Sequence, residues 1–320
     1  MNLRVLEAYL QGNYLLDKRS GDKEMRKAQG YFQQAIDADA NFAPAYIGMA
    51  YSHYLLLQSS TEDRAIAKAS AEKALSLDPF SSEAHSTLGS MKFSDWDWPG
   101  AEQEFRRAIA LNPNSAVHEG VCAVLAVKGR LDEALKECQI AQTLDPDGDH
   151  LASVLEARGE YTPAIELLLK DVQNHPDTPD LHYYLFRDYD LSGSPKESVL
   201  ELERFLTLFG HPEIAAKVHR AFVASGYLGA MREWAQAFEW LHTTNEMYVP
   251  RVVAEVYARL GDKDRAFYWL EQAYEHRDRI GDYGGIESIK VMHELDPLRS
   301  DPRYADLLRR IGLPPYLVGR

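Results

Sequence analysis

Helical runs in this 320-residue chain stop at a nearly constant spacing, and this spacing limits the fold more than any other feature. The runs KALSLDP, RAIALNP and IAQTLDP end at Pro79, Pro113 and Pro146, which lie 34 and 33 residues apart. LLKDVQNHP ends 30 residues later at Pro176, and FLTLFG ends at Gly210 after a further 34. Proline stops a helix because it cannot donate the next backbone hydrogen bond. A regular period of this length predicts an array of stacked units.

Each unit has the pattern of two short helices joined by a turn. SEAHSTLGSMKF contains Gly89, and GAEQEFRRAIALNP contains Ala101, Phe105 and Ala108. Small residues let the two helices approach closely, and the phenylalanine fills the gap to the next pair. The same small residues recur in other units: Ala67, Ala74, Ala134, Ala141, Ala266 and Ala273. Because one hairpin cannot bury its apolar face alone, we expect an all-α solenoid of about eight helix-turn-helix hairpins.

We expect the hairpins to form one array over 1–320. It contains regular repeats over 1–146, divergent repeats over 147–246, and a last repeat with a C-terminal capping helix, DPRYADLLRR, over 247–320. The first helix of the fifth unit is shortened by about a turn, so a kink is expected near 149–158. A glycine marks the turn between the two helices in four units: Gly129, Gly159, Gly193 and Gly226.

The stretch SDWDWPG forms the corresponding turn of the third unit. Trp96 stands where the other units carry glycine. Asp97 is a natural N-cap for the next helix, and Pro99 is tolerated in its first turn. We interpret Trp96 and Trp98 as packing anchors. The alternative is that they form a platform for a carbohydrate or a peptide.

The 34-residue unit, its small residues and its closing proline resemble the tetratricopeptide repeat (TPR) from about Leu6 to Pro146 and again from Tyr248 to Tyr274. This resemblance implies a right-handed superhelical solenoid. DWDWPGAEQEFRRAIALNP and LRSDPRYADLLRRIGLP are also similar to the C-terminal TPR regions of multidomain bacterial signalling and transcription-regulatory proteins, in which a winged-helix domain, a kinase or a cyclase precedes the repeats. That similarity implies a regulatory or protein-interaction module.

Composition limits the kinds of partner and the compartment. Lys and Arg total 35 against 49 Asp and Glu, a formal charge of −14, so we expect no direct nucleic-acid binding. No apolar stretch is long enough to cross a membrane, and the N-terminus lacks the features of a signal peptide. The only two cysteines, Cys122 and Cys138, are interpreted as buried thiols. These features predict a cytoplasmic protein.

No catalytic or cofactor motif is present. The sequence contains no HExxH, P-loop, GxSxG or CxxC pattern. The histidines nearest to a cluster do not have metal-ligand spacing: His175, His182, His211 and His219. We therefore expect no enzyme activity, no cofactor and no metal.

The first helices of the hairpins line the concave face of such a solenoid, where these folds bind. The repeat register places Tyr51, Tyr54 and Phe93 on the N-terminal half of this face. On the C-terminal half it places four more residues: Tyr183, Arg187, Arg220 and Arg251. The three arginines recur at nearly the repeat period and predict a clamp for a carboxylate or phosphate. The alternative is that each arginine pairs with a local acid, such as Asp188, Glu213 or Glu255.

These features together predict a non-enzymatic module that binds a protein or peptide, including one with acidic groups, along the concave face. The first alternative is a sensor that binds a small ligand between Tyr51, Tyr54, Trp96 and Trp98. The second is an enzyme on a helical scaffold, for which the sequence offers no converging set of titratable groups. The sequence sets no oligomeric state.

Overall fold

The computed structural model consists of helices, turns and connecting segments, with no strand in the residues it describes. These residues are 2–18, 21–56, 61–114, 117–144, 150–243, 250–276 and 285–315. The chain divides into two compact units, Met1–Val124 and Leu125–Arg320. The predicted repeat boundaries at 146/147 and 246/247 fall outside the described residues. A single array over 1–320 stays a prediction.

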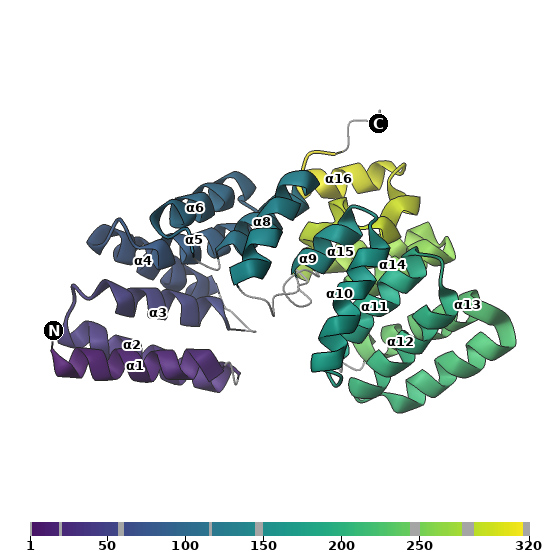
Figure 1. The fold of residues 1–320 in the computed structure, drawn as a ribbon, viewed down its shortest axis with the longest axis horizontal. Helices are drawn as coiled ribbons and strands as arrows, with labels where there is room; N and C mark the ends of the chain where they lie inside the picture. Colours follow the sequence, from purple (N-terminus) through teal and green to yellow (C-terminus); the bar gives the residue numbers. More distant parts are fainter. Residues whose placement is uncertain are drawn as a thin grey trace. The chain divides into compact units, whose positions relative to one another are not determined.

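The N-terminal unit is a series of helical hairpins in which consecutive helices pack on each other (Figure 1). Its helices are α1 (Leu3–Lys18), α2 (Asp22–Ala38), α3 (Ala43–Tyr54), α4 (Thr61–Leu77), α5 (Ser82–Ser94) and α6 (Trp98–Leu111). Helix α7 (His118–Val127) begins in this unit and ends in the next.

The C-terminal unit continues the hairpin pattern and ends in a different kind of segment. Its α-helices are α8 (Leu131–Leu144), α9 (His150–Ala157), α10 (Tyr161–Asn174), α11 (Pro179–Leu191), α12 (Pro195–Leu208), α13 (Pro212–Thr243), α14 (Pro250–Leu260), α15 (Lys263–His276) and α16 (Pro302–Arg310). Between α15 and α16 lie two 3-10 helices, η1 (Ile286–Lys290) and η2 (His293–Leu298). Helix α9 covers eight described residues, and the shortening of the fifth unit stays a prediction because residues 145–149 lie outside the described part of the chain.

The predicted glycine turns are confirmed. Gly129, Gly159 and Gly193 have φ values of 78°, 78° and 79°, in the left-handed region that favours glycine. Gly226 has φ 68° and breaks α13 into two helices across a kink. The sequence therefore marked a hairpin turn within what is otherwise one continuous helical segment.

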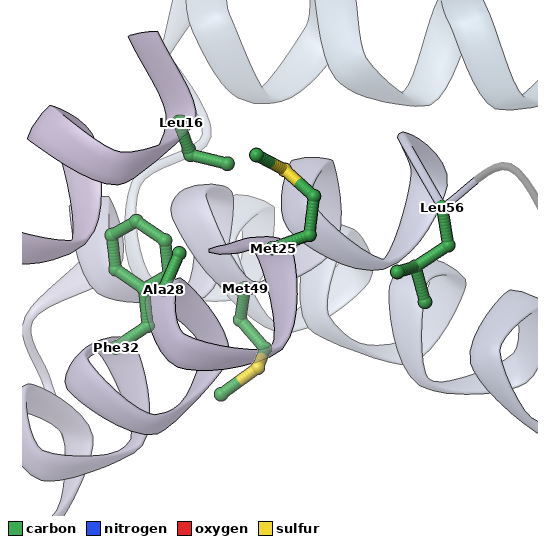
Figure 2. Close-up of a cluster of buried hydrophobic side chains, with 6 residues drawn as sticks. All are labelled: Leu16, Met25, Ala28, Phe32, Met49 and Leu56. Atoms are coloured by element: carbon green, nitrogen blue, oxygen red, sulfur yellow. The ribbon is translucent and has the colours of Figure 1, made fainter. Parts of the chain in front are cut away.

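Aromatic rings on second helices lie where the neighbouring first helices have no side chain. The Phe105 ring on α6 lies against Gly89 of α5 and Gly120 of α7, and a Cβ at either glycine would be 2.7 Å from a ring carbon. Phe32 on α2 lies in the same way against Gly12 and Gly48. Figure 2 shows Phe32 with the surrounding buried cluster. The predicted gap-filling role of the phenylalanine is confirmed.

The SDWDWPG turn has the predicted geometry. Trp96 has φ 63° and is the one non-glycine residue with positive φ in the described part of the chain. The Asp97 side chain accepts a hydrogen bond from the backbone N–H of Gly100 at 3.0 Å, which is the expected N-cap. Trp98 is buried and packs edge-on against Phe93, with ring centroids 5.2 Å apart. Trp98 is therefore a packing anchor rather than an open platform.

The predicted C-terminal helix is α16. The Asp301 side chain caps it by accepting from the N–H of Arg303, and Tyr304, Leu307 and Leu308 are buried. Two ion pairs attach it to α15, from Arg303 to Asp264 at 2.9 Å and from Arg310 to Glu271 at 2.7 Å. The helix thus covers the outer surface of the last hairpin.

The interpretation of the two cysteines as thiols is wrong. Cys122 on α7 and Cys138 on α8 are buried, as expected, but both are disulfide-bonded. The physical reason is that facing small-residue positions of consecutive helices bring side chains within bonding reach. None of the described helices is both long and apolar enough to span a membrane.

The ring-against-glycine packing predicts unequal costs for two phenylalanine truncations. Phe105→Ala should lower the free energy of unfolding by about 3–5 kcal/mol, because it opens a cavity between three helices. Phe80 is 69% exposed, so Phe80→Ala should change it by less than about 0.5 kcal/mol. Urea denaturation followed by circular dichroism measures both. Similar losses in the two variants would contradict this packing role.

Candidate functional site

The predicted groove residues of the N-terminal unit form a half-buried aromatic row. Tyr51 and Tyr54 on α3 stack, with ring centroids 6.2 Å apart and an interplanar angle of 25°. Ser94 on α5 donates a hydrogen bond from Oγ to the Tyr54 hydroxyl at 3.1 Å. Phe93, also on α5, packs on Trp98. Tyr51, Tyr54 and Phe93 each keep part of their surface exposed. First helices of two successive hairpins therefore contribute to this row.

A separate cavity of about 560 Å³ lies in the same unit. Its lining comes from α2, α3 and α4: Gln29, Gly30, Gln33, Ile36, Tyr46, Met49, His53, Ile66 and Ser70. Nε2 of Gln29 is buried without a hydrogen-bond partner. Tyr51 and Tyr54 do not line this cavity, so it is distinct from the aromatic row.

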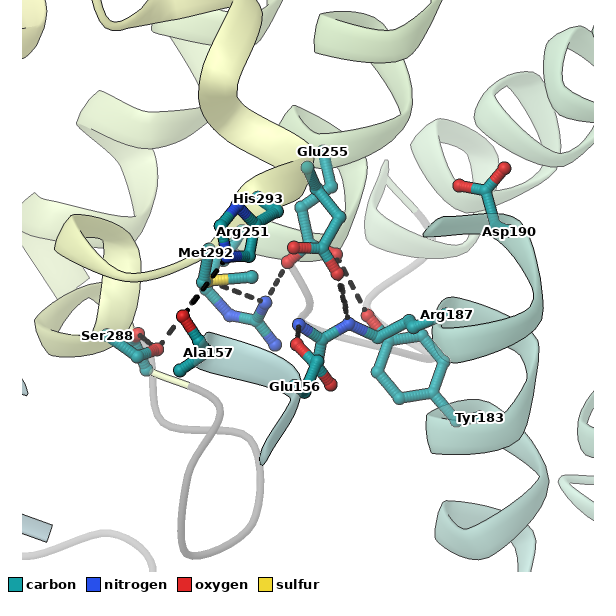
Figure 3. A network of polar contacts seen from close by, with 12 residues as sticks. Glu156, Ala157, Tyr183, Arg187, Asp190, Arg251, Glu255, Ser288, Met292 and His293 are labelled. Carbon is teal, nitrogen blue, oxygen red and sulfur yellow. Dashed lines mark hydrogen bonds and ion pairs between the residues drawn. The ribbon is translucent and has the colours of Figure 1, made fainter. Parts of the chain in front are cut away.

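In the C-terminal unit, the predicted groove residues Tyr183, Arg187 and Arg251 are buried, with exposed fractions of 4%, 6% and 1%. They lie on α11 and α14 and converge on the carboxylates drawn in Figure 3. The Tyr183 hydroxyl donates to Oε2 of Glu255 at 3.2 Å. Nη1 of Arg251 donates to Oε1 of the same carboxylate. For Arg251, local pairing with Glu255 is the arrangement observed.

Arg187 joins three helices. Its Nε donates to Oε1 of Glu294 on η2 at 2.5 Å, and its Nη2 donates to Oε1 of Glu156 on α9 at 2.6 Å. Oε2 of Glu255 lies 3.9 Å from the same Nε. Arg187 therefore binds carboxylates, as the clamp hypothesis requires, but these carboxylates belong to its own chain.

The segment Ile286–Leu298, which contains η1 and η2, supplies the other side of this cluster. Nη1 of Arg251 donates to the Met292 sulfur at 3.5 Å. The His293 ring nitrogen Nε2 lies 3.1 Å from the Ala157 carbonyl, and Lys290 donates to the Lys128 carbonyl at 2.9 Å. Four apolar side chains anchor the segment and are fully buried: Ile286, Ile289, Leu295 and Leu298. The first helices α9, α11 and α14, called the inner face below, are thus covered by this segment.

The third predicted arginine lies elsewhere. Arg220 is exposed on α13 and makes no ion pair with any residue the structure describes. A residue that the sequence reasoning missed, Arg259 on α14, is the third buried guanidinium instead. It pairs with Asp190 and lies 4.0 Å from Glu294. The structure therefore brings Arg187 and Arg251 together with Arg259 rather than with Arg220.

Burial and charge act in opposite directions on the carboxyl groups of this cluster. Burial would raise the pKa of Glu294, but Arg187 and Arg259 outweigh it and lower that pKa to about 2. Burial raises the pKa of Glu156 to about 7 against the charge of Arg187. Burial and then the charge of Glu156 raise the pKa of Asp188 to about 9. Glu294 is therefore the ionised partner of Arg187, whereas Asp188 holds a proton at neutral pH.

The sequence also missed Glu156 and Glu294. Glu156 lies on the first helix of the fifth unit, a position that the repeat register would have assigned to the inner face. Glu294 lies beyond the last repeat, where no periodic signal exists. In the described residues, no group of three or more His, Cys, Asp or Glu side chains is placed to hold a metal ion.

No protein-family model matches the chain, and no curated protein matches it. Solved structures do match. PilW, a widely conserved type IV pilus biogenesis factor, superposes with a TM-score of 0.57 at 15% identity, over 68% of this chain and 99% of its own. A tetratricopeptide repeat protein from Parabacteroides merdae gives 0.54 at 14% identity, over 83% and 99%. PilF from Pseudomonas aeruginosa gives 0.52 at 17% identity, over 67% and 97%.

The fold is a TPR solenoid. This agrees with the fold class predicted from the 34-residue period, the small residues and the closing prolines. Identities of 14% to 17% extend the likeness to the fold and not to the function of those proteins.

The buried cluster predicts different consequences for two arginines of the sequence-derived series. Arg187→Met should lower the free energy of unfolding by about 3–5 kcal/mol, because Glu294 loses the cation that compensates its burial. Arg220→Met removes an exposed side chain and should have no measurable effect. Urea unfolding at neutral pH compares the two. Equal effects of the two substitutions would contradict the assignment of Arg187 to a buried charge cluster.

Proposed function

We propose that this chain is a non-enzymatic module that binds a protein or peptide, and that the partner lies along the aromatic row of the N-terminal unit. The observation that carries this proposal is the pair of stacked, partly exposed tyrosines on α3, joined through Ser94 to α5. Tyrosine rings offer a large contact area and a hydroxyl while losing little side-chain entropy on binding. First helices of successive TPR hairpins present such side chains side by side.

The contacts already made on the inner face of the C-terminal unit also support a binding site in the N-terminal unit. Arg187 and Arg251 already bond to Glu294 and Glu255, so an acidic peptide would have to displace a carboxylate of the chain itself. Arg220 is exposed on α13, whereas the two buried arginines lie on α11 and α14. A clamp in which the three arginines together hold an acidic partner therefore has less structural support than binding along the aromatic row.

We propose a bacterial signalling or transcription-regulation system as the setting, and the cytoplasm as the location. The support is the resemblance of DWDWPGAEQEFRRAIALNP and LRSDPRYADLLRRIGLP to TPR regions of such regulators. The disulfide-bonded state of Cys122 and Cys138 weighs against a reducing compartment, where disulfides are rare. The redox state of the purified protein from cytoplasmic expression tests this part of the proposal.

A small-ligand sensor is the second candidate, and the cavity near Met49 favours it. Its volume of about 560 Å³ falls in the range of ligand sites. The buried Gln29 amide supplies a donor without a partner. Trp98, named above as a stacking residue for such a ligand, is buried beside Phe93 and does not line this cavity. A sensor would therefore use α2, α3 and α4 rather than the predicted tryptophans.

Selection of peptides on the intact chain tests the binding proposal. A phage-displayed library of random peptides is selected on the native protein, and isothermal titration calorimetry measures the enriched peptides. Replacing both Tyr51 and Tyr54 by alanine should weaken Kd at least about tenfold, because the aromatic contact is lost.

Tyr268→Ala provides the control, because Tyr268 is 57% exposed on α15 in the other unit. It should leave Kd unchanged. Two results would count against the proposed site: the absence of any enriched peptide, or peptides that bind the tyrosine variant as tightly as the native chain.

A further inference from the structure

The cluster beneath Ile286–Leu298 contains more carboxyl groups than cations. Three guanidiniums face it: Arg187 from α11, and Arg251 and Arg259 from α14. Five carboxyl groups face it: Glu156 from α9, Asp188 and Asp190 from α11, Glu255 from α14 and Glu294 from η2. If all ionised, a site closed to water would hold two uncompensated negative charges, which is a costly arrangement.

The geometry identifies which two carboxyl groups are in excess. Each guanidinium has one carboxylate as its main partner: Glu294 for Arg187, Glu255 for Arg251, and Asp190 for Arg259. Glu156 is a second acceptor on Arg187, at 2.6 Å.

Asp188 is buried, and its Oδ1 has no hydrogen-bond partner. Oε2 of Glu294 is unpartnered as well. Glu156 and Asp188 therefore fit in the closed cluster only when their carboxyl groups are protonated.

We propose that residues 286–298 form a proton-dependent clasp on the inner face of the C-terminal unit. The clasp is held while Glu156 and Asp188 carry protons and is released when both ionise. Ionisation of both groups would turn the central contact, Arg187 with Glu294, from a compensated pair into part of a net negative cluster, and release of the segment would relieve that charge. It would also uncover Tyr183, Arg187 and Arg251. The clasp does not depend on the proposed binding function of the N-terminal unit.

The direction of the pH effect follows from the protons bound in each state. In the closed state, burial raises the pKa of Glu156 to about 7 and that of Asp188 to about 9. In the open state both groups meet water and return toward ordinary values near 4. The closed state therefore binds more protons above about pH 4, so closure is strongest at low pH. It weakens as pH rises, until Glu156 ionises in the closed state at about pH 7 and Asp188 at about pH 9.

Among the other titratable groups, Lys290 on η1 acts against this direction, because burial and the charge of Lys128 lower its pKa. One lowered pKa is opposed by two raised carboxyl pKa values, so the direction is kept. His293 on η2 points Nδ1 at Asp296, 3.2 Å away, and its lowering of the Glu156 pKa is smaller than the raising by burial. Tyr161 on α10 lies beside His293, and burial raises its pKa to about 12. Tyr183 on α11 and Tyr227 on α13 also have raised pKa values because of burial. These phenols stay neutral over the range in which the clasp opens.

Hydrogen exchange measured by mass spectrometry on the full chain tests the clasp. Exchange in peptides that cover 286–298 is compared at about pH 6 and about pH 9, after correction for the intrinsic rates. We expect protection to fall at least about tenfold at the higher pH, since each net proton released weakens closure up to tenfold per pH unit. Peptides from α1 to α6 serve as the internal reference and should keep their protection.

Two variants separate this clasp from general alkaline loosening. The double change Glu156→Gln and Asp188→Asn keeps the shapes but removes the titration, so the segment should stay protected at about pH 9. Glu197→Gln changes an exposed carboxyl on α12 and should behave like the native chain. The proposal is overturned if native protection of 286–298 is equal at both pH values. It is also overturned if the folded double variant loses as much protection as the native chain.

Discussion

The packing of successive helices in this chain depends on phenylalanine rings that lie against glycines of the neighbouring helices. Phe105 reaches the backbone of Gly89 in its own hairpin and of Gly120 in the next, and Phe32 does the same with Gly12 and Gly48. A side chain at any of these glycines would collide with the ring. Helices of successive hairpins can therefore approach closely, and each hairpin buries the apolar face that it cannot bury alone.

The C-terminal unit buries the inner face of its hairpins in another way. Its inner face carries three buried guanidiniums and the segment 286–298, rather than an open row of aromatic side chains. Apolar anchors such as Ile289 and Leu295 provide the driving force for docking, because charged pairs offset their own desolvation only in part. The charges instead fix which segment fits, since Glu294 must meet Arg187. A face that resembles a partner site in the sequence is thus part of the interior of the protein.

This difference separates the two units in function. Tyr51 and Tyr54 keep exposed surface and hydroxyl groups, which is the state expected of side chains that await a partner. Arg187 has its hydrogen bonds satisfied within the chain. The proposed division of labour is therefore binding by the N-terminal unit and proton-dependent closure of the inner face in the C-terminal unit.

The sequence by itself determined the hairpins, their turns and their ring-to-glycine packing, because these depend on contacts that repeat every 34 residues or so and leave a periodic trace. The sequence also indicates where a non-glycine residue occupies the turn, since Trp96 stands where other units place glycine at positive φ. Only the tertiary structure decided that Glu294 meets Arg187, that Arg259 takes the place of Arg220, and that the two cysteines are bonded. These contacts join residues outside the repeat register or depend on distances between side chains, and no spacing along one sequence records them.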